Sequence, residues 1–247
     1  MTRAWRRIAR GAAGVVLLGL AWEAFARSRL FAPALTPTVE TIAGALLRMV
    51  LDGSLFGHAL FTLYRVLSGL ALAALVGIPL GLLMGRWRPA ERFFLPLLSV
   101  LMPIPSLAWV PLFILWFGLG NTATIMLVFY AATFPLMYNT WTGVRSINRL
   151  WLRAASAMGA DDQALFRKVV LPGALPLVIT GLRQAFARSW IAVVGGEMIA
   201  ASAWGLGWVI FDAKEFLNTD VMLGVLVVIG GLGLLFERVV FQALEAR

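Results

Sequence analysis

Three ionisable side chains lie inside one apolar segment of the chain, and charged groups in such segments are by default candidates for function. Arg183 and Arg188 follow Ala174 in a run that continues to Ala200, and Glu197 comes nine residues after Arg188. Nine residues make two and a half helical turns, which disfavours a direct bond within one helix. Arg188 therefore has two interpretations, contact with an anion in transit or an ion pair with Glu197. Arg183 is expected to reach the interface or to pair with a neighbouring backbone carbonyl.

The sequence lacks the side chains that most enzymes use for catalysis. The chain has no Cys and a single His, which excludes thiolate chemistry and a His-based metal cluster. His58 has no Asp or Cys pattern near it and is expected to be solvated or interfacial. An intramembrane hydrolase would need Ser with His or Lys, or paired Asp, inside apolar segments, and those segments contain no Asp. No G-x-x-x-x-G-K-[S/T] loop occurs, so we expect no ATP bound by this chain in that way and no metal or cofactor.

The composition identifies the class of protein. Of 247 residues, 61% are hydrophobic and only 13% are charged, and the mean hydropathy is +0.87. Soluble domains have roughly 45–50% apolar and about 25% charged residues. The chain is therefore predicted to be an integral membrane protein. Almost all of the residues behind its net charge of +9 lie between apolar runs, so the charge indicates topology and attraction to anionic headgroups rather than nucleic-acid binding.

Six apolar segments approach the length of about 20 residues that a membrane-spanning helix needs. They are Gly11 to Phe25, Leu60 to Gly85, Phe93 to Gly118, Thr122 to Gly143, Ala174 to Ala200 and Val221 to Val240. The first is the weakest, and its Arg-rich start and Ala24-Phe25-Ala26 triplet also fit a cleavable signal peptide. A retained first helix gives the more consistent topology. The sequence thus predicts an all-α protein with six transmembrane helices.

The Lys and Arg residues between these segments predict the orientation, because short cytoplasmic loops carry the excess. One side receives fourteen: Arg3, Arg6, Arg7, Arg10, Arg86, Arg88, Arg92, Arg145, Arg149, Arg153, Arg167, Lys168, Arg238 and Arg247. The other side receives five: Arg27, Arg29, Arg48, Arg65 and Lys214. Both termini are therefore predicted to be cytoplasmic.

Local signals refine this outline on the outer side and in the third span. Thr36 and Pro37 predict the start of an amphipathic surface helix that ends at Gly53. The prolines of the third span, Pro103, Pro105 and Pro111, argue against a straight helix there. Residues 202–220 are expected to form a short re-entrant or surface element. In the fourth span Thr133, Tyr138, Asn139, Thr140 and Thr142 are expected to make hydrogen bonds between helices or to form a polar gate.

The longest inner connection, residues 144–170, predicts two short helices with a bend between them. Asn148 can cap the first helix, and Gly159 supplies the left-handed residue that ends it. The second helix is expected to begin at Asp161 or Asp162 and to end in Arg167 and Lys168.

These residues resemble the EAA signature, E-A-A-x3-G-x9-I-x-L-P, of permease subunits in ATP-binding cassette (ABC) importers. The matching pattern is Ala154-Ala155-x3-Gly159-x9-Val169-x-Leu171-Pro172. Arg153 stands where the family often has Glu, and Val169 where it has Ile. Five further segments, 65–69, 77–81, 103–112, 116–120 and 205–207, look like the nitrate/sulfonate/taurine branch of those permeases. The resemblance covers roughly residues 36 to 240.

The resemblance implies the type I ABC importer permease fold and a place in a larger assembly. Two permease copies, here a homodimer, would enclose one path in the bacterial inner membrane. Two cytoplasmic ATPase subunits, which hold ATP and Mg, would dock on them, and a binding protein outside would deliver the substrate. A small anion such as a sulfonate, taurine or nitrate is the expected solute. A neutral or cationic vitamin precursor, or an ATPase-independent secondary transporter, are the alternatives.

The expected organisation divides the chain into residues 1–35 with the first helix, 36–58 with the outer amphipathic helix, and 59–243 as the permease core. The resemblance places ATPase coupling on residues of the inner connection and of the helix start that follows it: Arg153, Ala154, Ala155, Ser156, Met158, Gly159, Asp161, Leu171 and Pro172. The candidates for the translocation path are Trp109, Tyr138, Asn139, Arg188 and Glu197.

Overall fold

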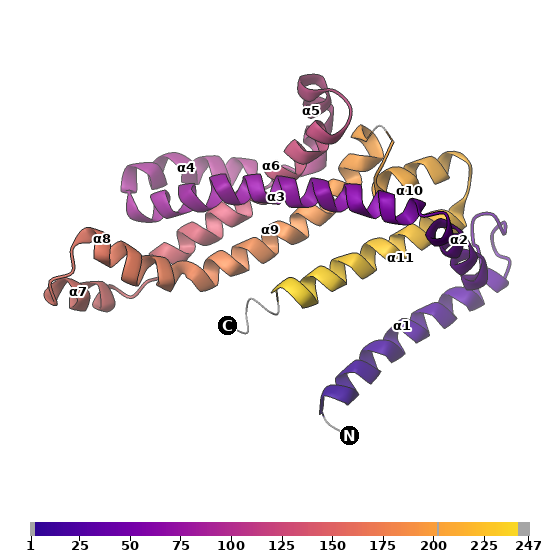
Figure 1. Cartoon of the computed structure of the whole chain (residues 1–247), viewed down its shortest axis with the longest axis horizontal. Helices are drawn as coiled ribbons and strands as arrows, with labels where there is room; N and C mark the ends of the chain where they lie inside the picture. Colours follow the sequence, from indigo (N-terminus) through magenta and orange to yellow (C-terminus); the bar gives the residue numbers. More distant parts are fainter. Residues whose placement is uncertain (1–2, 202, 242–247) are drawn as a thin grey trace.

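The computed structural model describes residues 3–201 and 203–241, and this part is helical without a strand. Figure 1 shows an elongated bundle in which α3, α6 and α9 run along the long axis. The helices are α1 (Arg3–Arg27), α2 (Val39–Leu51), α3 (Ser54–Arg86), α4 (Arg88–Leu101), α5 (Val110–Phe117), α6 (Asn121–Arg145), α7 (Arg149–Ala157), α8 (Asp162–Leu165), α9 (Leu171–Ala200), α10 (Leu206–Glu215) and α11 (Thr219–Phe236). Three short helical turns accompany them: η1 (Ser106–Trp109) precedes α5, η2 (Phe166–Val170) joins α8 to α9, and η3 (Glu237–Phe241) follows α11. The all-α prediction is confirmed for the described residues.

Small residues bring α3 close to α6. They recur every four residues along α3, at Gly69, Ala73, Gly77, Gly81 and Gly85. A Cβ at Gly81 would lie 2.6 Å from the Met137 carbonyl oxygen of α6, closer than side-chain carbons come to backbone oxygens. In a membrane, where helix association depends on close packing rather than on water, such a stripe lets two backbones approach.

Three described helices are long and apolar enough to cross a membrane: α3, the helix that runs from Asp162 through α9 to Ala200, and α11 continued to Val239. The bent pair of α4 with the segment 106–117 makes a fourth if it counts as one span. α1 and α6 have 25 residues each, or about 37 Å of helix, but do not meet the same test. Six spans therefore stay a prediction.

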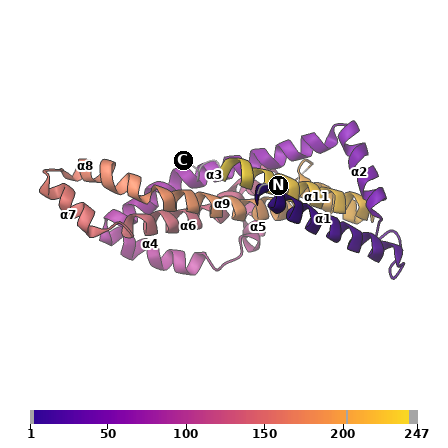
Figure 2. The same ribbon diagram turned by 90° about the horizontal axis from the view of Figure 1, so that it is seen from below.

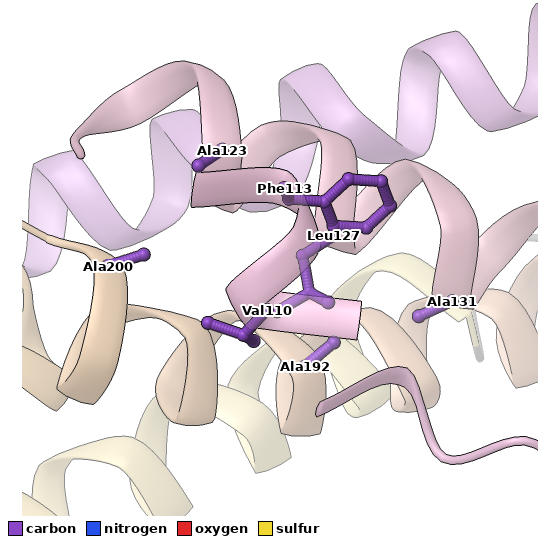
Figure 3. Packing of buried hydrophobic residues seen from close by; sticks show 7 residues of the cluster. All are labelled: Val110, Phe113, Ala123, Leu127, Ala131, Ala192 and Ala200. Atoms are coloured by element: carbon purple, nitrogen blue, oxygen red, sulfur yellow. The ribbon is translucent and has the colours of Figure 1, made fainter. Parts of the chain in front are cut away.

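The third predicted span is broken, as its prolines indicate. α4 ends at Leu101, and the chain turns by 91° before η1 and α5. Pro103 and Pro105 occupy this elbow, where their missing amide hydrogens cost no helical bond. α5 then packs on α6 and α9 through a cluster of seven buried apolar residues, shown in Figure 3: Val110, Phe113, Ala123, Leu127, Ala131, Ala192 and Ala200. Gly118 and Gly120 have positive φ and turn the chain into α6, as expected of a helix-ending turn.

Two helix boundaries differ from the prediction. α2 begins at Val39 with Thr38 as its cap, since the Thr38 side chain accepts a hydrogen bond from the Thr41 amide. The prediction that Thr36 caps this helix was wrong, because the Pro37 carbonyl instead accepts a hydrogen bond from Trp22 of α1. The helix after Gly159 does not end near residue 168 either: it continues through a π turn, η2, directly into α9.

α1 lies apart from the bundle along most of its length, as Figure 1 shows. Its C-terminal end is attached to α2 by two hydrogen bonds. The Trp22 indole donates to the Pro37 carbonyl at 3.0 Å, and the Val39 amide donates to the Glu23 carboxylate at 2.8 Å. The rest of the helix presents exposed apolar side chains such as Leu17 and Leu18.

Candidate functional site

A cavity of about 340 Å³ lies under the proline elbow. Its wall is formed by residues 101–107, by Tyr130, Ala131, Phe134 and Pro135 of α6, and by Arg188 and Ile191 of α9. Among the described residues that form this wall, Arg188 is the only charged one. Its guanidinium makes no hydrogen bond or ion pair with any residue that the structure describes, so its donors are free to bind an anion.

The position of Arg188 is fixed by the helices that pack around the cavity. Arg188 is in the middle of α9, whose Ala192 packs against α5 and α6 one turn further on. The Tyr130 hydroxyl donates to the Leu101 carbonyl at 3.1 Å and so ties α6 to the end of α4. The elbow is thereby fixed above the guanidinium. An apolar pocket with one cation can bind a small anion and exclude a cation by charge.

Trp109, another predicted path residue, lies behind this wall and does not line it. Its ring packs on Tyr130 at 5.0 Å between centroids, and its buried indole nitrogen has no hydrogen-bond partner among the described residues. Trp109 therefore supports the position of Tyr130.

Glu197 is not in the cavity. Its side chain is 0% exposed and accepts three hydrogen bonds: from Arg65 at 2.7 Å, from the Thr62 hydroxyl at 2.9 Å and from the Gly207 amide at 2.9 Å. The partner of Glu197 is thus Arg65 of α3, 132 residues away in sequence, and not Arg188.

Arg65 has further bonds that fasten two more elements. Its Nε donates to the Asn121 side chain at the start of α6 at 2.9 Å, and its Nη1 donates to the Trp204 carbonyl. The Leu206 amide donates to Thr62 at 2.9 Å. We call Thr62, Arg65, Asn121 and Glu197, with the backbone of 204–207, the buried ionic cluster. It joins the N-terminal half of α3, the start of α6, the end of α9 and the start of α10 through the Arg65–Glu197 pair.

Two predictions on single residues were wrong at this place. His58 is buried, where we expected a solvated or interfacial group: it accepts a hydrogen bond from the Gly205 amide at 3.1 Å and stacks on Trp208. Arg65, assigned to the outer loops by charge counting, is 2% exposed within α3. The signal was present, because Arg65 lies inside a predicted span and Glu197 inside another, and each needs an opposite charge.

The remaining polar residues of the two long helices lie away from the cavity. Arg183 pairs with Glu237 in η3. Asn139 donates to the Gln184 side chain at 3.1 Å and so joins α6 to α9, while the Thr133 hydroxyl bonds within its own helix. Tyr138 is exposed beside Trp141. Neither Tyr138 nor Asn139 lines the Arg188 cavity.

The bent segment of the inner connection projects at one end of the molecule, as Figures 1 and 2 show. Asn148 caps α7 by accepting from the Leu150 amide at 2.8 Å, Gly159 has φ 86°, and Asp161 caps α8. Three large apolar side chains are exposed here, and Met158 is 88% exposed. A short helix with unpartnered apolar side chains is suited to packing in a groove of another protein.

The other residues predicted for this function share that surface or lie next to it. Arg153, Ala154 and Ser156 are exposed on α7, Ala155 is half-buried, and Leu171 and Pro172 are exposed at the start of α9. Among the described residues no group of three or more His, Cys, Asp or Glu side chains could hold a metal ion.

Three comparisons with known proteins identify the family of this chain. Residues 77–246 match the family described as "binding-protein-dependent transport system inner membrane component". The chain is 38% identical over 210 residues to a putative ABC transporter permease of Methanocaldococcus jannaschii, covering 83% of this chain and 79% of that protein. It is 33% identical over 237 residues to the taurine transport system permease protein of Escherichia coli, covering 94% and 86%.

One further relative is named for another solute, and one solved structure shares the fold. The chain is 35% identical over 237 residues to a bicarbonate transport system permease protein of Synechococcus elongatus, covering 92% of this chain and 85% of that protein. Among solved structures, the inward-facing MetNI methionine ABC transporter aligns with a TM-score of 0.68 at 22% identity, covering 79% of this chain and 97% of that chain. This likeness concerns the fold.

Proposed function

The chain belongs to the family of binding-protein-dependent transport system inner membrane components, and on this premise we propose that it forms the path for a small anion. It is a permease subunit and not an enzyme; in this family a separate ATPase subunit hydrolyses ATP. The relatives named for taurine and bicarbonate support an anionic solute. The observation that carries the choice is Arg188, a guanidinium in an otherwise uncharged cavity that has no partner among the residues placed by the structure.

Arg188 would act as a transient anion site. A charge in a pocket of low dielectric attracts an anion more strongly than in water, but a single monodentate or bidentate contact without further cations allows release. The buried ionic cluster would have no contact with solute, because Glu197 is fully enclosed and would repel an anion. It would instead keep the ends of four helices in a fixed arrangement around the path.

The exposed bent segment would dock the ATPase. Its shape supports this role: a capped short helix, the left-handed Gly159, and exposed apolar side chains of which Met158 is the most exposed. Since η2 continues into α9 without a break, a displacement of the segment would be transmitted to Arg188 along one continuous helix. This gives ATPase movement a direct mechanical route to the cavity.

The complete assembly would hold two copies of this chain, two ATPase subunits with ATP and Mg, and an external binding protein. Both termini would be cytoplasmic in an inner membrane. The described basic residues support this orientation, because the end of the molecule that carries α7 and α8 also holds eight of them: Arg86, Arg88, Arg92, Arg145, Arg149, Arg153, Arg167 and Lys168.

The test is reconstitution. We would place the complex of this chain with its ATPase and binding protein in proteoliposomes and measure ATP-dependent uptake of labelled taurine, an aliphatic sulfonate and bicarbonate, with thiamine as a cationic control. Uptake of one anion that depends on ATP and on the binding protein is expected. Uptake without the ATPase, or uptake of the cation alone, would contradict the proposal.

A further inference from the structure

A second crevice, of about 360 Å³, lies between the bent segment and the bundle. It is formed where α3 and α6 end and where α7 and α8 begin. Its charged wall consists of Arg86, Arg145, Arg149 and Asp162. Three guanidiniums and one carboxylate give this crevice an excess of two positive charges. Neither the proposed ATPase docking nor the Arg188 cavity accounts for this excess of charge.

The packing of α3 and α6 brings two of these arginines together. A Cβ at Gly85 would overlap the Val144 side chain, since even the more distant Cγ2 lies 3.1 Å away. Without a side chain at Gly85 the two helix ends make contact, and the next residue of each is an arginine, Arg86 and Arg145. Two like charges held together in this way repel each other, and a bound anion relieves the repulsion.

The arginine donors are only weakly engaged by the protein. Arg86 lies over the Phe166 ring at 5.3 Å, and its guanidinium makes no hydrogen bond or ion pair with another described residue. Arg145 is 3.6 Å from Glu91, which is long for a charged hydrogen bond, and its side chain is 45% exposed. Arg149 makes no hydrogen bond or ion pair within the part of the chain that the structure describes.

We propose that this crevice binds a phosphate group. Guanidiniums present planar pairs of donors that match two oxygens of a phosphate. Several guanidiniums around one crevice also suit a negative charge that is shared among the phosphate oxygens. The apolar part of the wall, which includes Leu152, Leu165, Phe166 and Val170, fits the glycerol and first acyl carbons of a phospholipid. The group can come from an anionic lipid headgroup or from a free phosphate.

A bound phosphate would connect the ends of α3 and α6 to the base of the bent segment. Arg86 and Arg145 belong to the bundle, and Arg149 is the first residue of α7. One anion that contacts all three restricts the movement of α7 relative to the bundle. This would make the stiffness of the segment depend on lipid composition or on phosphate, separately from the transported solute.

Direct binding to the purified full-length chain tests the proposal. The chain would be delipidated in neutral detergent, and affinities for phosphatidylglycerol, for phosphatidylcholine and for inorganic phosphate would be measured by native mass spectrometry and calorimetry. The variant is Arg86→Gln/Arg149→Gln. The matched control is Arg167→Gln/Lys168→Gln, which removes the same charge from exposed residues of the same connection that do not line the crevice.

We expect the crevice variant to lose roughly 30-fold in affinity, the value for two basic residues near an anionic group, and the control to lose about threefold or less. Preferential binding of phosphatidylglycerol identifies a lipid headgroup as the source, and binding of inorganic phosphate identifies a soluble one. A second variant, Arg86→Lys/Arg149→Lys, serves if the Gln variant does not fold. It keeps the charge, so it should retain most of the electrostatic affinity but lose the preference for phosphate over chloride.

Three results would overturn the proposal. The first is that neither ligand binds to the wild-type chain. The second is equal loss in the crevice variant and the control, which would indicate unspecific attraction. The third is a Lys variant that prefers phosphate over chloride as strongly as the wild-type protein.

Discussion

Removing the arginine of the buried ionic cluster should destabilise the protein far more than removing an exposed one. Arg65→Met keeps most of the side-chain volume but leaves the Glu197 carboxylate 0% exposed without its countercharge. At an effective dielectric constant of about 20, charge centres about 4 Å apart attract by about 4 kcal/mol. Breaking a buried pair in this way typically costs about 3–5 kcal/mol, so we expect that loss in the free energy of unfolding.

Thermal unfolding of the purified chain in one detergent measures this loss. At about 2–4 °C per kcal/mol for a chain of this size, the midpoint should fall by about 6–20 °C. Arg48→Met is the matched control, because Arg48 lies 3.5 Å from Asp220 with its side chain 70% exposed, and such pairs contribute about 0–1 kcal/mol.

The double variant Arg65→Met/Glu197→Gln separates charge from packing. The Gln amide oxygen can still accept from the Thr62 hydroxyl or the Gly207 amide, and no charge remains buried. We therefore expect the double variant to be more stable than Arg65→Met alone. Equal midpoints for Arg65→Met and Arg48→Met, or a double variant that is no more stable than Arg65→Met, would refute the reasoning.

The other predictions concern the cavity, the bend and the helix packing. Arg188→Leu should abolish anion uptake by the reconstituted complex while the amount of assembled complex stays constant, and Arg188→Lys should keep part of the uptake; normal uptake by the Leu variant would exclude Arg188 from the path. Gly159→Val should strain the left-handed bend by about 1–3 kcal/mol and reduce recovery of the ATPase complex in a pull-down, whereas Ala157→Ser should not. Gly81→Val should cost about 1–3 kcal/mol or more in thermal stability through overlap with α6, a loss that Gly14→Val, with no atom within 4 Å of its added Cβ, should not show.

Much of the local structure follows from short stretches of sequence. The cap at Asn148, the positive φ of Gly159 and the broken third span at Pro103 are each predicted from residues within one or two turns. Prolines and left-handed glycines act on the backbone where they stand, so their effect does not depend on distant contacts. The errors at Thr36 and near residue 168 arose where another element, α1 or α9, took part in the boundary.

The sequence by itself determined the membrane class, the order of the helices, the proline elbow and the glycine bend. Only the tertiary structure decided which charges meet: Glu197 pairs with Arg65 rather than Arg188, Arg188 faces a cavity, and the crevice arginines converge from three helices. A soluble helix reveals its buried face by a polar opposite face, but a membrane helix is apolar on all sides. Its rotation and register are set by small residues such as those of α3 packing against a neighbour, and that neighbour becomes known only when the chain is folded.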